Sequence, residues 1–258
     1  MTAPLLQLET VSMQFGGLRC ISDFSFSVAN GELVGLIGPN GAGKTTVFNL
    51  ITGVYRPTAG RIAFAGKSVI GHRPYRITAR GIARTFQNVR LFSSLSVFEN
   101  VRAACNMHLR RGISHALLRG GGFVREEGEI ESHIMELLEI FGLSAERESS
   151  CRALPYGDQR RLEIVRALAT RPKLLLLDEP AAGMNPTEKI DLMKLIRFTQ
   201  EKFGLAVLLV EHDMKVVMGI CQRIAVLDYG RKIAEGTADE IRHDPKVVAA
   251  YLGKEADA

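Results

Sequence analysis

The sequence predicts an α/β protein with an N-terminal β portion and a mainly helical segment inserted into its core. Three observations predict this class. Short apolar runs alternate with segments of helical spacing, which is typical of a sheet whose strands are buried on both faces. Apolar residues near the N-terminus recur at period two, as in half-buried strands. In the middle of the chain this pattern gives way to mixed charged, aromatic and turn residues.

The first part of the chain predicts strands and then a strand–turn–helix unit. Residues 5–28 alternate apolar and polar side chains, and residues 32–37 form a short apolar run suited to a buried strand. A glycine-rich turn over 38–43, a helix over 44–52 and another strand over 61–64 follow.

The middle of the chain predicts a helical insertion over roughly 88–160. Residues 128–141 carry apolar side chains at helical spacing, which predicts an amphipathic helix. The glycines at 120–122 lie in a basic stretch and predict a flexible break. The α/β pattern then resumes with a helix ended by Pro172. Strands are predicted over 174–177, 205–210 and 224–227, and helices over 187–203, 213–220 and 238–252.

The composition excludes several classes of protein. Of 258 residues, 46% are hydrophobic and 24% are charged, which is enough apolar surface for a folded core. Each apolar run is far shorter than the roughly 20 residues of a membrane helix, and the N-terminus does not resemble a secretory signal. The net charge of +5, from 33 basic and 28 acidic residues, could meet nucleic acid, lipid head groups or nucleotide, but its modest size favours a solvated surface. No nucleic-acid partner is expected. The four cysteines lack metal-ligand spacing and predict free thiols in a reducing compartment.

The clearest motif is the phosphate loop G-x-x-x-x-G-K-[ST], which lies between the predicted buried strand and the following helix. Its glycines let backbone N–H groups turn toward phosphates, and the positive end of the helix adds to that field. Lys44 is expected at the β- and γ-phosphates, and the Thr45 hydroxyl at Mg²⁺. The predicted nucleotide-binding residues of this segment are Gly38, Pro39, Asn40, Gly41, Ala42, Gly43, Lys44, Thr45 and Thr46.

A second motif places two carboxylates at the end of the apolar run 174–177. Asp178 is expected to hold the Mg²⁺ shell, and Glu179 to polarise a water for attack on the γ-phosphate. Solvated acids at the end of a strand are the alternative interpretation, which the upstream phosphate loop disfavours.

With these motifs in this order, the chain resembles the ATP-binding subunits of ABC transporters over about residues 5–253. The resemblance implies a single domain. It has a nucleoside-triphosphatase core with a phosphate loop, a helical subdomain inserted at approximately 88–160 and an N-terminal antiparallel β portion. It also implies ATP hydrolysis, with ATP and Mg²⁺ as the bound groups.

Three further residues take family roles through this resemblance. Gln87 matches the glutamine that reaches Mg²⁺ and the attacking water, and that connects the site to the transmembrane partner. His212 follows a buried strand and matches the histidine that contacts the γ-phosphate. Phe15 matches the aromatic residue that stacks on adenine.

Residues 154–159 occupy the place of the family signature, which caps the γ-phosphate of ATP bound to the opposite subunit. Pro155 replaces the usual serine and has neither a hydroxyl nor an N–H group. The N–H groups of Tyr156 and Gly157 are the expected phosphate donors, and Asp158 is expected to cap its own helix. Asn185 stands where the family usually has aspartate at the end of the D-loop.

Several segments resemble the LivG-type ATPases of bacterial branched-chain amino acid importers; they are 84–87, 156–164, 178–186 and 211–215. This resemblance implies a peripheral protein on the cytoplasmic face of the membrane. Its partners would be transmembrane permease subunits, a second ATP-binding subunit and, indirectly, a solute-binding protein. A short permease helix is expected to dock in a groove near Val89, Leu91 and Phe92, and burial of these three side chains in the core would contradict that docking.

Other functions remain open at this point. A lipopolysaccharide-export ATPase ends in a similar sequence, and amide or urea systems share the motifs. A soluble ABC ATPase would keep every nucleotide motif but lack membrane partners. A small kinase with a phosphate loop would not carry these motifs in this order, and a regulator without useful turnover is favoured by Pro155 alone.

Overall fold

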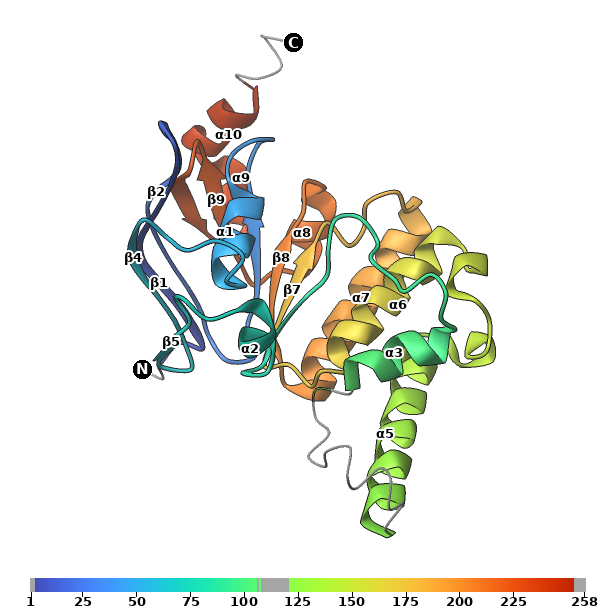
Figure 1. The fold of residues 1–258 in the computed structure, drawn as a ribbon. Helices are drawn as coiled ribbons and strands as arrows, with labels where there is room; N and C mark the ends of the chain where they lie inside the picture. The colour runs from blue at the N-terminus through green and yellow to red at the C-terminus, as the bar shows by residue number, and fades with distance from the viewer. Residues whose placement is uncertain (1–2, 106, 108–120, 253–258) are drawn as a thin grey trace.

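The protein is described by a computed structural model covering residues 3–105, 107 and 121–252 (Figure 1). An antiparallel sheet near the N-terminus has the strand order β2-β1-β4-β5. Its strands are β1 (Leu6–Phe15), β2 (Leu18–Val28), β4 (Ala59–Phe64) and β5 (Lys67–Ser68). This sheet confirms the β structure predicted for 5–28 and 61–64.

The core sheet has the order β10-β9-β3-β8-β7-β6, and β10 alone is antiparallel to its neighbour within this set. Its strands are β3 (Leu33–Ile37), β6 (Ile82–Arg84), β7 (Leu174–Asp178), β8 (Ala206–Val210), β9 (Arg223–Asp228) and β10 (Arg231–Gly236). Strands β3, β7 and β8 are buried along their full length. Burial on both faces explains why their sequences are continuous apolar runs.

Two hydrophobic clusters cover the two faces of the core sheet. In β7, Leu174 and Leu176 belong to the cluster that includes α1 (Lys44–Ile51) and the antiparallel sheet. Leu175 and Leu177 belong to the cluster that includes most of the other helices. Since side chains alternate along a strand, β7 contributes to both clusters, and Asp178 is its last residue.

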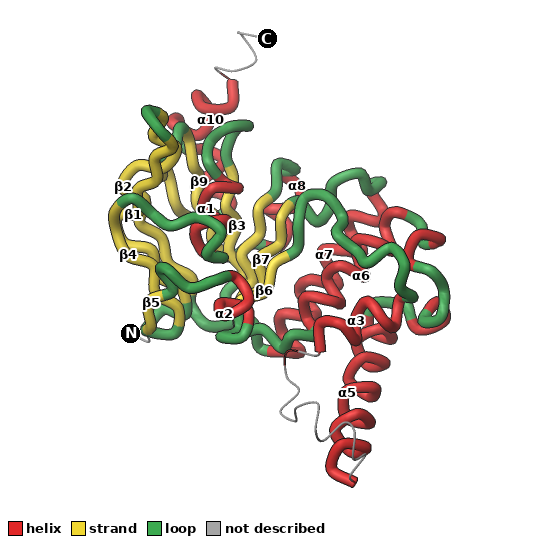
Figure 2. Tube along the Cα trace, in the orientation of Figure 1, coloured by secondary structure: helices red, strands yellow, loops and turns green. Residues whose placement is uncertain are grey.

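Helix α6 (Tyr156–Leu168) packs against α3 (Val97–Cys105) and α5 (Gly121–Ile140). These three helices lie in the right-hand part of the molecule (Figure 2). The remaining elements are α2 (Pro74–Thr78), η2 (Ser144–Glu146), η3 (Cys151–Ala153), α7 (Pro186–Phe203), α8 (Met214–Ile220), α9 (Ala238–His243) and α10 (Pro245–Leu252). Within the described residues, no helix combines the length and apolarity needed to cross a membrane.

Helix α5 differs from the sequence expectation at its start. The predicted break at 120–122 is wrong for Gly121 and Gly122, which are helical, while Gly120 lies outside the described residues. The C-terminal half of α5 is anchored by the buried side chains of Ile134, Leu137 and Leu138. Helix growth from a packed segment is cooperative, which outweighs a glycine cost of about 1 kcal/mol per residue.

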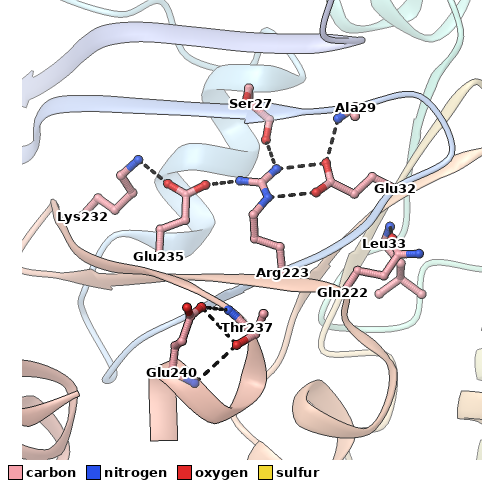
Figure 3. A network of polar contacts seen from close by, with 10 residues as sticks. All are labelled: Ser27, Ala29, Glu32, Leu33, Gln222, Arg223, Lys232, Glu235, Thr237 and Glu240. Atoms are coloured by element: carbon pink, nitrogen blue, oxygen red, sulfur yellow. Dashed lines mark hydrogen bonds and ion pairs between the residues drawn. The ribbon is translucent and has the colours of Figure 1, made fainter. Parts of the chain in front are cut away.

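A polar network joins the edge of the core sheet to the antiparallel sheet (Figure 3). The Arg223 guanidinium on β9 donates to both carboxylate oxygens of Glu32, at 2.8 and 2.9 Å, and to the carbonyl of Ser27, at 2.7 Å. It also donates to Glu235 on β10, which in turn pairs with Lys232. One side chain therefore connects β9, β10 and the end of β2.

Candidate functional site

The phosphate loop connects β3 to α1, and its backbone conformation requires glycine at two positions. Gly38 has a φ of +152°, and a Cβ there would lie 2.0 Å from the carbonyl oxygen of Leu227. Gly43 has a φ of +107°, and a Cβ there would lie 2.7 Å from Ile21. Any other residue would collide with β9 or β2, so the glycine pattern follows from this close packing.

Lys44 is held inside this loop. Its side chain is buried, and the ammonium group donates to the carbonyls of Gly38 and Pro39 at 2.7 and 3.0 Å. Helix α1 begins at Lys44 without a side-chain cap at Gly43. The first N–H groups of a helix have no intrahelical acceptor, so the loop gathers a positive charge and backbone donors at one place.

A cavity of about 380 Å³ opens beside the loop. Eight of the predicted residues line it: Asn40, Gly41, Gly43, Lys44, Thr45, Thr46, Gln87 and Glu179. Four residues that were not predicted also line it: Leu18, Arg19, Cys20 and Tyr229. The loop is placed beside these segments by the bonds from the Gly230 N–H to Ala42 and from the Ser22 N–H to Gly230.

Asp178 is buried at the end of β7 and accepts a hydrogen bond of 2.8 Å from Arg84. Its burial raises the pKa of the carboxyl, although the Arg84 hydrogen bond and charge oppose that rise. The backbone N–H of Asp178 donates to the Thr85 hydroxyl at 3.2 Å. Arg84 also donates to Asn49 at 2.6 Å and lies over the ring of Phe48, so a buried arginine orients this carboxylate.

Glu179 has a left-handed backbone with a φ of +48°, which costs on the order of 1–3 kcal/mol for a residue other than glycine. Its N–H donates to Val210 on the neighbouring strand at 2.8 Å. Its carboxylate accepts a hydrogen bond from Gln87 at 3.1 Å and lies 3.7 Å from Nδ1 of His212. The structure therefore brings together three residues that are far apart in the sequence.

Phe15 lies outside the residues that line the cavity. It is half-exposed, and its ring packs edge-on against Tyr55 with 5.0 Å between the ring centroids. An exposed aromatic face at the end of β1 is compatible with base stacking, and the predicted contact with adenine stays a prediction.

The signature segment forms the beginning of α6, and none of residues 154–159 lines the cavity. Pro155 is the N-cap residue, with φ −52° and ψ 152°, so proline fits this helix start without strain. The ring of Tyr156 lies 3.0 Å from the position of a Cβ on Gly183, and this close approach together with a φ of +76° favours glycine there. The expectation that Asp158 caps the helix is wrong: no side-chain cap is formed, and Asp158 lies 3.6 Å from Arg161 one turn along α6.

The segment after Glu179 is fixed by two polar residues. Asn185 caps α7 by accepting from the Glu188 N–H at 3.0 Å, and Glu188 accepts from the Asn185 N–H at 2.9 Å. Glu211 is buried, which raises its pKa, and it accepts from the Ala181 N–H at 2.8 Å. No local pattern in the chain indicates this role for Glu211, because its partner lies 30 residues away.

This arrangement defines a class of nucleotide-binding protein, and comparison with known families agrees with it. The family described as ABC transporter matches residues 21–182. The family described as branched-chain amino acid ATP-binding cassette transporter matches residues 231–257. The chain therefore belongs to the ABC transporter family, as one of its ATP-hydrolysing ATP-binding subunits, and this confirms the resemblance inferred from the motifs.

Individual relatives are similar over nearly the whole chain. The high-affinity branched-chain amino acid transport ATP-binding protein BraF of Pseudomonas aeruginosa is 43% identical, with 98% of this chain and all of BraF covered. The protein LivG of Escherichia coli, which carries the same description, is 44% identical with the same coverage. The crystal structure of the ADP conformation of MJ1267, an ATP-binding cassette of an ABC transporter, has a TM-score of 0.84 and 30% identity. That match covers 98% of this chain and all of MJ1267.

Proposed function

We propose that this chain hydrolyses ATP in the cavity beside the phosphate loop and thereby powers the import of branched-chain amino acids. The main support for the hydrolytic site is the contact of 3.1 Å between Gln87 and Glu179, which both line that cavity. The descriptions of BraF and LivG, together with the family match at residues 231–257, support the class of transported substrate.

In this proposal the phosphate loop binds the triphosphate. The backbone of residues 38–46 supplies N–H donors, and Lys44 supplies a positive charge that is already desolvated. Phe15 would support the adenine ring from the end of β1. Leu18 and Tyr229 line the cavity and would add apolar contact to the nucleotide.

The residues near Asp178 fit Mg²⁺, which is bound by hard oxygen ligands and shares them with substrate phosphates. The predicted ligands are the hydroxyl of Thr45, the carboxylate of Asp178 and the amide oxygen of Gln87. Among the described residues, no group of three or more His, Cys, Asp or Glu side chains could hold a metal alone. In the proposed site the nucleotide phosphates would share the ion with these residues, and the ion would neutralise charge on the phosphates.

Glu179 would orient the attacking water as a general base, because its carboxylate faces Gln87 and His212. His212 would contact the γ-phosphate from the end of β8. The left-handed backbone of Glu179 is a strained conformation that the surrounding structure maintains.

None of residues 154–159 lines the cavity. This supports a site completed by a second ATP-binding subunit, in which the N–H groups of Tyr156 and Gly157 contact the nucleotide held by the opposite chain. Closure of the pair excludes water and strengthens the electrostatic contacts. Loss of the γ-phosphate after hydrolysis removes those contacts and lets the pair open. The second subunit is expected to be a distinct protein.

A groove of about 500 Å³ between α2, β6, α3 and α6 is the proposed permease site. It contains Phe86, Arg90 and Phe92, and the Phe92 side chain is 53% exposed. Val89 and Leu91 are half-buried, so none of the three predicted docking residues is buried in the core. A short cytoplasmic helix of a permease would fit such a groove. The chain would then work at the cytoplasmic face of the membrane, with a solute-binding protein acting through the permease.

We also infer a single domain over 5–253, with the helical subdomain inserted at approximately 88–160. Helices α3 and α5 fall within that span, whereas α6 continues to Leu168 and connects directly to β7.

The test of the proposed function is recovery of the Glu179→Gln chain from native membranes in the presence of ATP. Two permease subunits, a second ATPase and an amino-acid-binding protein are the expected companions. Lys44→Ala is the matched control, since it should not be trapped with ATP. Recovery of lipopolysaccharide-export membrane proteins would instead indicate an exporter. Recovery of no membrane protein would favour a soluble ATPase.

A further inference from the structure

A buried ion pair on α6 holds the backbone of the segment that carries Gln87. Arg160 and Glu163 lie one turn apart, with 3.6 Å between Nη1 and Oε2. Their side chains are 3% and 2% exposed. Two opposite charges this deeply buried need further hydrogen bonds to offset their loss of water. Here those bonds go to the main chain of residues 86–90.

The contacts are reciprocal. Glu163 accepts from the N–H groups of Phe86 and Arg90, at 3.2 and 3.4 Å. Arg160 donates to the carbonyl of Phe86 at 2.9 Å and to the carbonyl of Gln87. The planar guanidinium suits this double contact, because its N–H groups have a fixed fork geometry.

The same pair connects the start of α6 to the proposed base. The Arg160 guanidinium lies over the ring of Tyr156, 5.2 Å from its centroid, at the start of α6. Beyond the pair, the Gln87 side chain donates to Glu179 at 3.1 Å. An unbroken series of contacts therefore runs from the signature tyrosine through Arg160 and the Gln87 backbone to the proposed base.

We propose that Arg160 and Glu163 are positioning residues for Gln87. They fix residues 86–90 to α6, so that a displacement of the signature helix moves Gln87 relative to Glu179. The geometry of the hydrolytic site then depends on the position of α6, and through Tyr156 on the opposite subunit. The catalytic part of this inference rests on the role given to Gln87 under the proposed function.

The first test is amide hydrogen exchange of the full chain without nucleotide. Arg160→Met combined with Glu163→Leu removes the contacts without leaving one buried charge unpaired. Exchange of the amides at 86–90 should rise by at least about fivefold, because two of them lose their acceptor. Arg102→Met with Glu127→Leu is the matched control, since this pair on α3 and α5 is half-exposed and joined at 2.5 Å. Unchanged exchange at 86–90 would overturn the proposal.

The second test is a mutant cycle in steady-state ATP hydrolysis. The double substitution should lower kcat by roughly 10–100-fold and leave KM within about threefold, because the phosphate loop is untouched. In a Gln87→Ala background the same substitution should change kcat by less than about twofold. An equal loss in both backgrounds would show that the pair acts elsewhere. If the double variant fails to fold, Arg160→Lys replaces it, because lysine keeps the charge without the fork. Its kcat should lie below that of the parent, by less than the 10–100-fold expected of the double substitution.

The two tests separate two kinds of failure. If Gln87→Ala hydrolyses ATP at the parental rate, the role of Gln87 under the proposed function is wrong, and the catalytic part of this inference is wrong with it. The exchange result does not depend on turnover and decides whether the ion pair holds the segment.

Discussion

Lys44 places a desolvated positive charge where the phosphates are expected. We predict that Lys44→Ala weakens ATP binding by roughly 10–100-fold, the usual effect of losing a hydrogen bond to a charged group. Titration calorimetry with Mg-ATP measures this change. Lys67→Ala is the control, because Lys67 is exposed on β5 and should leave the affinity unchanged. Parental affinity in Lys44→Ala would contradict the assignment of the phosphate site.

Glu179 faces Gln87 and His212 from a strained backbone position. We predict that Glu179→Gln keeps ATP binding and slows hydrolysis by roughly 10²–10⁴, the usual contribution of a positioned base. Phosphate release under saturating ATP measures the rate, and the calorimetric affinity serves as the control for folding. Turnover close to that of the parent would remove Glu179 as the base.

At the residue scale, the sequence could predict those site residues that are neighbours in the chain. The phosphate loop could be predicted because its donors are neighbours in the chain, and Asp178 and Glu179 because they follow an apolar run. Tyr229 could not, since it reaches the cavity through a hairpin almost 190 positions after the loop. The pairing of Arg84 with Asp178 depends on the neighbouring strands β6 and β7, which the sequence does not pair.

Helix α7 begins at a capping box built by Asn185 and Glu188. We predict that Asn185→Ala destabilises the protein by about 1 kcal/mol, or a fall in Tm of about 2–4 °C for a chain of this size. Thermal unfolding followed by circular dichroism measures it. Asn185→Asp should keep the parental Tm, since aspartate accepts the same hydrogen bond. An equal fall in both variants would contradict a capping role.

At the element scale, the buried strands and amphipathic helices were predictable because their periodicity reflects burial directly. Helix α5 extends further than its apolar pattern, since a packed helix can propagate into glycine. The side chain of Asp158 was expected to cap α6, but it forms an ion pair with Arg161 instead. Local preference is therefore overridden by helix growth at the start of α5 and by a neighbouring charge at Asp158.

At the scale of the whole molecule, Arg223 connects the core sheet to the end of β2 (Figure 3). Burial alone would raise the pKa of Glu32, but hydrogen bonds from Arg223 and the Ala29 N–H leave it below its ordinary value of 4.5. A lowered pKa means that this carboxylate stabilises the fold above its unfolded pKa. That stabilisation is lost as the pH falls through the lower, folded value.

We therefore predict that Glu32→Gln lowers the free energy of unfolding by roughly 1–3 kcal/mol at pH 7, and that the difference from the parent shrinks as the pH falls below 4.5. Urea denaturation at a series of pH values measures both. Glu9→Gln is the control, because the Glu9–Arg61 pair is exposed and 4.0 Å apart, and it should change stability by less than about 1 kcal/mol. A difference that grows on acidification would reverse the sign of this contribution.

The phosphate loop lies between the two sheets, because Gly38 closely approaches Leu227 on β9 and Gly43 closely approaches Ile21 on β2. A Cβ added to Gly230 would lie only 2.3 Å from the carbonyl oxygen of Cys20. A ligand that binds this loop in the folded chain, and does not bind the unfolded chain, stabilises both sheets by mass action. Nucleotide loading should therefore be readable in the unfolding of the antiparallel sheet, most of which lies away from the cavity. A spectroscopic reporter on β4 or β5 would then measure occupancy of a site that it never touches.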